Sequence, residues 1–164
     1  MFISFKKLTV ILIAVLFFQA CGYKMAGLDG KRDYTLSIKN VYNMTPEPDL
    51  EKDIDNVAVS FFSSRDVLGS KNSSTYTSEL KLKELVFESR IVTKTGQTGT
   101  ASVRCVLEIL IKDRTGQEIF KGNFEGRTVY DISADLGKTR TNRTEAIQYI
   151  LRLALMDFYH DFRP

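Results

Sequence analysis

Two cysteines and one histidine are the side chains of this 164-residue chain with the most reactive chemistry. Cys21 follows Ala20 at the end of an apolar run, and a thiol in that position can accept a diacylglyceryl group on sulfur. Cys105 lies in the alternating segment 103–109, so we expect it to be a buried small hydrophobe. If Cys21 carries lipid, Cys105 has no partner for an intramolecular disulfide. His160 stands near the end of the chain, and we expect it on the surface.

Catalysis needs more than one reactive side chain. A base requires a nucleophile and an orienting partner, and the sequence marks neither for His160. Metal sites need clustered ligands, and phosphate-binding glycine loops have a recognisable spacing that does not occur here. The sequence therefore predicts a protein that is not an enzyme and that has no cofactor and no metal site.

The N-terminal segment has the pattern of an export signal. Lys6 and Lys7 precede the apolar run Leu8–Phe18, which is eleven residues long and interrupted only by Thr9. A helix that spans hydrocarbon needs roughly 20 apolar residues, so this run is too short for a membrane span. Its length is typical of the apolar part of a signal peptide, which we assign to residues 1–20.

The residues around the expected cleavage site resemble a bacterial lipobox. Ala20 and Cys21 fit its usual form, whereas Phe18 and Gln19 depart from it. The resemblance implies cleavage before Cys21 and acylation of that residue, with palmitate among the attached chains. Two or more chains make anchoring stable. Gly22 follows the cysteine, where aspartate would signal retention in the inner membrane, so we expect the outer membrane. The alternative is an ordinary signal peptide, or an uncleaved anchor, with an incidental cysteine.

Removing residues 1–20 leaves 144 residues with 21 Lys and Arg against 20 Asp and Glu. This near-neutral balance gives no reason to expect nucleic-acid binding. Residues 21–33 hold three glycines and are expected to be a tether from the lipid to the domain. Residues 34–164 are long enough for one domain with its own core.

The first half of the domain has one strand pattern and one helix pattern. Residues 34–41 alternate between apolar and polar, which predicts a strand. We expect Asp49 to cap a helix that begins at Leu50. The helix has an apolar stripe at helical period, formed by Leu50, Ile54, Val57, Ala58, Phe61 and Phe62.

The second half predicts three strands and a second helix. The strands cover 76–92, 101–112 and 118–130, with a bulge or bend near Glu84, where the apolar phase switches, and a hairpin tip over 93–100. Residues 131–141 are expected to form a polar loop, and Asn142 with Glu145 predicts a capping box at the start of the last helix. We expect Lys138, Arg140 and Arg143 to be solvated basic residues.

These elements predict an α+β fold. The expected architecture is a two-layer sandwich of a mixed four-stranded sheet with two helices on one face, in the order β-α-β-β-β-α. Two helices with single apolar stripes and one apolar sheet face can bury each other.

The mature chain resembles the LptE family of lipopolysaccharide-assembly lipoproteins. The resemblance rests on the element order and on a few short motifs, which are Cys21-Gly22-Tyr23, Gly27, Leu36-Ser37-Ile38, Asn43-Met44-Thr45, Pro48 and Leu50. It covers the whole mature chain in architecture, but at motif level only about thirty residues after Cys21.

The resemblance implies a non-enzymatic role as a plug in the β-barrel of an LptD-like partner. The protein would assist assembly of the barrel and insertion of lipopolysaccharide into the outer leaflet, facing the periplasm or lying inside the barrel lumen. Basic residues of the family at strand-connecting tips bind the lipid, and by location the candidates here are Arg90, Lys94, Lys112 and Arg114. They could pair with phosphates, or they could only keep the strand ends soluble. The alternative function is a structural or pilotin-like lipoprotein that binds another envelope or secretion component.

Overall fold

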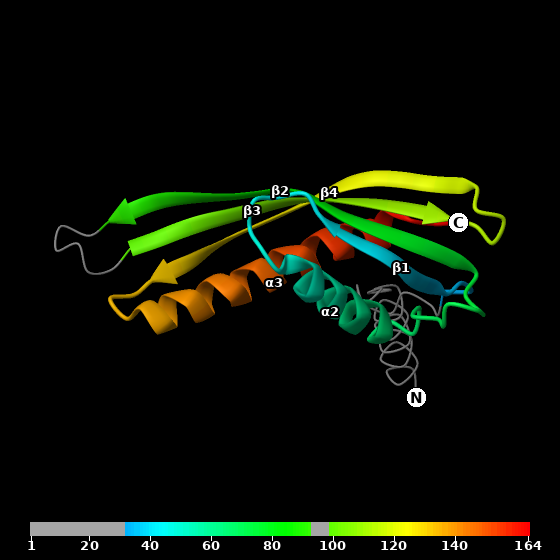
Figure 1. The fold of residues 1–164 in the computed structure, drawn as a ribbon, viewed down its shortest axis with the longest axis horizontal. Coiled ribbons are helices and arrows are strands. Elements are labelled where there is room, and N and C mark those ends of the chain that lie inside the picture. The colour runs from blue at the N-terminus through cyan, green and yellow to red at the C-terminus, as the bar shows by residue number, and fades with distance from the viewer. Residues whose placement is uncertain (1–31, 93–98) are drawn as a thin grey trace, which may run out of the picture. The chain divides into compact units, whose positions relative to one another are not determined.

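A computed structural model describes residues 32–92 and 99–164, without the side chains of residues 89–92. The elements follow the order β1 (Leu36–Asn43), α2 (Leu50–Ser63), β2 (Tyr76–Val92), β3 (Gly99–Lys112), β4 (Glu118–Ile132) and α3 (Leu136–Asp161). The four strands form one mixed sheet, and both helices cover the same face of it (Figure 1). This arrangement confirms the predicted α+β fold. The expected signal peptide, Cys21 and most of the tether lie outside the described residues.

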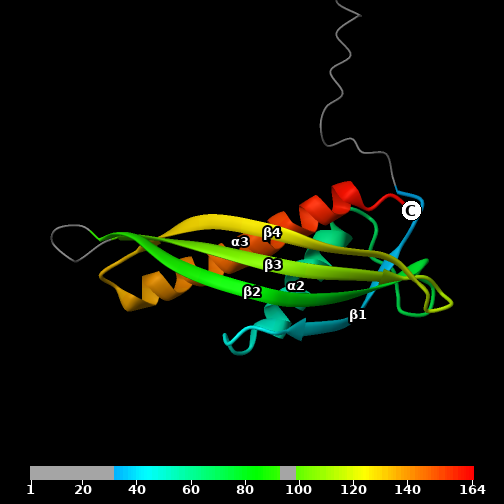
Figure 2. The same cartoon turned by 90° about the horizontal axis from the view of Figure 1, so that it is seen from above.

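The strands lie in the order β1-β2-β3-β4, as seen from above the sheet in Figure 2. β1 runs parallel to β2, and the other neighbouring strands are antiparallel. The register of β2 against β3 shifts between Leu82 and Glu84, which confirms the predicted irregularity near Glu84. The expected hairpin tip lies largely outside the described residues.

Helix α2 forms as its periodicity predicts. The six residues of its apolar stripe are its buried residues, and they pack into the core under the sheet. Asp49 stands at the N-cap position, but the prediction that its side chain caps the helix is wrong. Its φ of 61° places the residue in the left-handed region, and the side chain makes no capping hydrogen bond.

Helix α3 begins earlier than its apolar pattern indicates. Its first residue is Leu136, not Asn142, and the Asp135 side chain accepts hydrogen bonds from the backbone N–H groups of Gly137 and Lys138. The predicted polar loop is therefore mostly helix. The first turns carry few apolar residues, so hydrophobic periodicity misses them, whereas an N-cap aspartate can start a helix without a stripe.

The core lies between the sheet and the helices. The rings of Phe120, Phe124, Phe158 and Phe162 stack or meet edge to face, with centroids 5.3–6.2 Å apart. Gly126 of β4 lies so close to α3 that a Cβ there would stand 2.0 Å from the Ile150 carbonyl oxygen. Glycine is thus required where α3 crosses β4.

Candidate functional site

The reactive side chains seen in the sequence are not gathered into one site. Cys105 is fully buried in β3, and burial raises the pKa of its thiol to about 11. His160 is exposed in the last turn of α3. Among the described residues no group of three His, Cys, Asp or Glu side chains could hold a metal ion. In the part of the chain that the structure covers, no helix is both long and apolar enough to cross a bilayer.

The candidate lipid-binding residues whose backbone is described lie at two ends of the sheet. Arg90 belongs to the end of β2 that leads to the hairpin tip, and Lys94 lies outside the described residues. Lys112 ends β3, and Arg114 follows it in the next turn. At about 3.3 Å per residue, the 14 residues of β3 separate the two ends by roughly 40 Å. The candidates therefore do not form a single basic patch.

Both candidates whose side chains are described have partners within the domain. The Lys112 Nζ lies 3.0 Å from a carboxylate oxygen of Glu79. The Arg114 Nε donates to the backbone carbonyl oxygen of Ser74 at 3.2 Å. A phosphate would have to replace these partners or share them.

The sheet face opposite the helices, here called the open face, carries the densest group of charges. No described element covers it (Figure 1). Most of its ion pairs join β3 to β2 or to β4, and the Arg127–Glu88 pair joins β4 to β2 across β3. The residues involved are Glu79, Lys81, Lys83, Glu84, Glu88, Arg104, Glu108, Lys112, Lys121, Glu125 and Arg127. These are six basic and five acidic residues, so the open face is nearly neutral.

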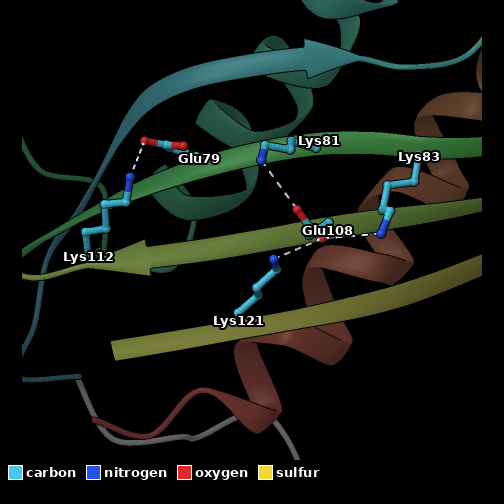
Figure 3. Close-up of polar contacts among 6 residues, drawn as sticks. All are labelled: Glu79, Lys81, Lys83, Glu108, Lys112 and Lys121. Carbon is cyan, nitrogen blue, oxygen red and sulfur yellow. Dashed lines mark hydrogen bonds and ion pairs between the residues drawn. The ribbon is translucent and has the colours of Figure 1, made fainter. Parts of the chain in front are cut away.

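Glu108 lies among Lys81, Lys83 and Lys121 on the open face, as Figure 3 shows. Its carboxylate oxygens lie 3.5 Å from Lys81 Nζ, 3.3 Å from Lys83 Nζ and 3.7 Å from Lys121 Nζ. The register shift after Leu82 places Lys83 beside Lys81 on this face. Only 9% of the Glu108 side chain is exposed.

The three lysines keep Glu108 ionised. Desolvation raises the pKa of its carboxyl group, but the hydrogen bond from Lys83 and the charges of Lys121, Lys83 and Lys81 outweigh it, so the net pKa is lowered. The three lysines are 34–52% exposed, so solvent screens these ion pairs and each contributes only about 0.5 kcal/mol. The ion pairs therefore favour one strand register more than they stabilise the fold. The apolar periodicity of the strands does not reveal this group of charges, because its members occupy the alternate positions. The sequence signal for the open face is the run of charged residues at every second position of the strands.

A second feature is a groove along the outer edge of β1, here called the β1 groove. It is lined by residues 37–41 of β1, by Glu51, Lys52, Asp55 and Val59 of α2, and by residues 68–71. Its volume is about 590 Å³. Ligand sites usually occupy about 300–1,000 Å³, so the β1 groove is large enough to hold a ligand or a peptide segment.

The start of the domain is fastened to the end of α3. Arg32 donates from Nη1 to the Phe162 carbonyl oxygen at 3.1 Å and from Nη2 to the Tyr159 carbonyl oxygen at 3.0 Å. Its guanidinium also lies 4.5 Å from the centroid of the Tyr159 ring. These contacts satisfy carbonyl groups at the C-terminus of α3 and hold the first described residue of the domain against that helix.

Solved structures share this fold. A candidate lipoprotein from Caulobacter crescentus is similar with a TM-score of 0.52 and 14% identity, over 74% of this chain and 86% of that one. The protein CT253 from Chlamydia trachomatis, of unassigned function, is similar with a TM-score of 0.51 and 9% identity, over 76% of this chain and 95% of that one. Rare lipoprotein B from Shewanella oneidensis has a TM-score of 0.46 and 14% identity, over 75% of this chain and 88% of that one.

At these identities the likeness establishes the fold and nothing finer. No protein-family model matches the chain, and no curated protein matches its sequence. The described residues therefore define an α+β protein whose fold also occurs in a candidate lipoprotein from Caulobacter crescentus.

Proposed function

We propose that this chain is a lipoprotein of the Gram-negative outer membrane, anchored through acyl chains on Cys21, which acts by binding rather than by catalysis. As in the LptE family, its partner is an LptD-like β-barrel protein. The chain assists assembly of that barrel and insertion of lipopolysaccharide into the outer leaflet.

One observation carries the proposal. The fold of this chain, with its β-α-β-β-β-α order, is similar at a TM-score of 0.52 to a protein described as a candidate lipoprotein. In this chain the same domain follows Cys21, which stands three residues after the end of a short apolar run. A fold without a described metal site or catalytic cluster, tethered at its N-terminus, suits a protein that acts through its surface.

The charges favour a protein partner over direct capture of an anionic lipid by the described surface. Each lysine of the open face lies near a carboxylate, and Arg114 is bonded to a backbone carbonyl oxygen. An anion-binding site would need basic groups that are not already neutralised. In this proposal lipopolysaccharide contact falls to the end of β2 that includes Arg90.

The same charge balance favours a second candidate function. A structural or pilotin-like lipoprotein would bind another envelope or secretion component and would need no lipid-binding patch. The identity of the bound protein distinguishes the two functions.

Affinity purification from detergent-solubilised membranes tests the proposal. The tag is placed after Pro164, which is exposed, so that the N-terminal cysteine stays native. We expect a large β-barrel protein in near-equimolar amount and loss of surface lipopolysaccharide when the chain is depleted. A secretion component in its place would support the second candidate, and the absence of any barrel protein would contradict the first.

The matched control is the tagged Cys21→Ser variant. Without the lipid acceptor the domain keeps its surface but loses its anchor, so we expect it in the soluble fraction with much less partner. Equal recovery of partner by this variant would show that binding does not depend on lipidation.

A further inference from the structure

The outer edge of β1 carries the beginning of a fifth strand. Leu36 forms a parallel bridge with Leu68, in which its N–H donates to the Val67 carbonyl oxygen at 2.7 Å and its carbonyl accepts from the Gly69 N–H at 2.8 Å. This is the bonding pattern of a parallel strand pair. The ladder stops there because the chain turns at residues 70–74, where the Ser73 and Ser74 N–H groups donate to the Ser70 carbonyl oxygen.

Beyond Leu36 the outer edge of β1 is unpaired within the described residues. β1 is the edge strand of the sheet, and apart from the Leu36–Leu68 bridge it pairs only with β2, in a ladder whose register shifts between Ile38 and Asn40. An exposed row of backbone donors and acceptors is a template for another extended segment. A strand entering here would continue the ladder that residues 67–69 begin, in the same parallel direction.

The β1 groove gives such a strand a place for its side chains. α2 runs back along β1 in the opposite direction and forms the second wall (Figure 1). Ile38, Val41 and Leu68 are partly buried apolar residues of the lining, and Val59 of α2 is 39% exposed. Side chains of a strand alternate, so every second side chain of an added strand would face these groups.

The charges of the groove indicate the kind of strand. Lys39 and Lys71 are exposed, whereas Glu51 and Asp55 flank Lys52 on the first turns of α2. Because α2 and β1 run in opposite directions, the acidic pair lies toward the end of β1 and Lys71 toward its beginning. The groove therefore suits a segment with an acidic residue near Lys39 or Lys71.

Two other occupants fit this charge pattern less well. A second copy that paired through its own β1 would place a second Lys39 across the same strand pair. Like charges across a strand pair are destabilising. The chain's own residues 22–31 carry Lys24 and Lys31 against a single Asp29. That segment is therefore basic, not acidic.

We propose that the β1 groove receives an extended segment of a partner protein, which adds to the sheet as a fifth strand parallel to β1 and places an acidic residue beside Lys39 or Lys71. This is strand addition, in which backbone bonds supply affinity and alternate side chains supply specificity. It rests on the proposed function only in requiring that the chain acts by binding a protein.

Site-specific photocrosslinking in the cells that produce the full-length lipoprotein tests this inference. The photoreactive residue p-benzoylphenylalanine replaces Val59 in the groove wall or, as the control, Val129, which is 59% exposed on β4. We expect an adduct with a second polypeptide from position 59 only. Mass spectrometry of the adduct should locate the joined residue in a segment that contains an acidic side chain.

Charge reversal tests the register. We expect Lys39→Glu to lower the yield of the position-59 adduct at least tenfold, whereas Lys39→Arg and the exposed control Lys138→Glu leave it unchanged. Reversal of the partner's acidic residue to lysine should restore the adduct in the Lys39→Glu background. If Lys39→Glu lowers the melting temperature, Lys71→Glu takes its place.

No adduct at position 59, an adduct with residues 22–31, an adduct with a second copy, or an adduct indifferent to charge reversal at both lysines would each overturn the inference. Recovery of a barrel protein by affinity purification without an adduct at position 59 would leave the proposed function standing while this inference fails. If neither a barrel protein nor an adduct at position 59 were found, the proposed function and this inference would both fail.

Discussion

Replacing Gly126 with alanine tests how α3 is seated on the sheet. The new Cβ would lie 2.0 Å from the Ile150 carbonyl oxygen and 2.7 Å from its carbonyl carbon. Close C···O contacts stay near 3.3 Å, so α3 and β4 would have to separate by about 1.3 Å at this point. The obstacle is backbone, and no side-chain rotation can relieve it.

We expect Gly126→Ala to destabilise the fold by about 3 kcal/mol, at the upper end of the cost of overpacking a core. Movement of α3 would also loosen the fully buried side chains of Leu151, Ala154 and Phe158. For a domain of this size the change corresponds to a fall in melting temperature of about 10 °C. Urea and thermal unfolding followed by circular dichroism would measure it, on residues 21–164 carrying Cys21→Ser.

Gly122→Ala is the matched control on the same strand. Its Cβ would meet ring atoms of Phe124 at 2.8 Å, and a side chain can shift more easily than a helix backbone. We expect a loss of about 1 kcal/mol. Gly126→Ala within about 0.5 kcal/mol of the parent, or no more harmful than Gly122→Ala, would refute the reasoning.

Three further changes probe other parts of the domain in the same background. Asp135→Ala should lower the free energy of unfolding in urea by about 1 kcal/mol, because it removes the α3 cap. Asp49→Gly should be neutral or stabilising, because Asp49 makes no capping bond and has a positive φ. A larger loss from Asp49→Gly than from Asp135→Ala would contradict these cap assignments. The pKa of Glu108 is lowered in the folded state, so its contribution to stability is complete above the usual carboxyl pKa and is lost as the pH falls through the folded value. Glu108→Gln should therefore lose less stability than the parent below about pH 4. Equal acid sensitivity of the two proteins would contradict the stabilisation of Glu108 by its three lysines. The Cys105 thiol should resist Ellman's reagent at pH 8 in the native state and react fully in guanidinium chloride, and rapid native labelling would contradict its burial.

The elements with a single clear period could be predicted from the sequence. The α2 stripe identified all six buried positions of that helix, because one face of an amphipathic helix must pack on the sheet. The phase switch near Glu84 identified the irregularity in β2, because an extra residue moves every later side chain to the other face. The burial of Cys105 followed from the same alternation in β3.

Features that depend on tertiary contacts or on polar bonds could not be predicted from periodicity. The first turns of α3 are held by Asp135, and Arg143 bonds to Glu47, 96 residues earlier. The need for glycine at position 126 arises only where Ile150 crosses β4. The open edge of β1 depends on which strands become neighbours, and no local pattern encodes that.

Lipid on the sulfur of residue 21 is the claim on which the functional account depends most. Cells expressing the tagged chain are fed an alkyne analogue of palmitate, and the purified protein is coupled to a fluorescent azide. We expect strong labelling of a membrane-bound wild-type product and none of the Cys21→Ser variant. A wild-type product that is unlabelled and recovered in the soluble fraction would contradict it.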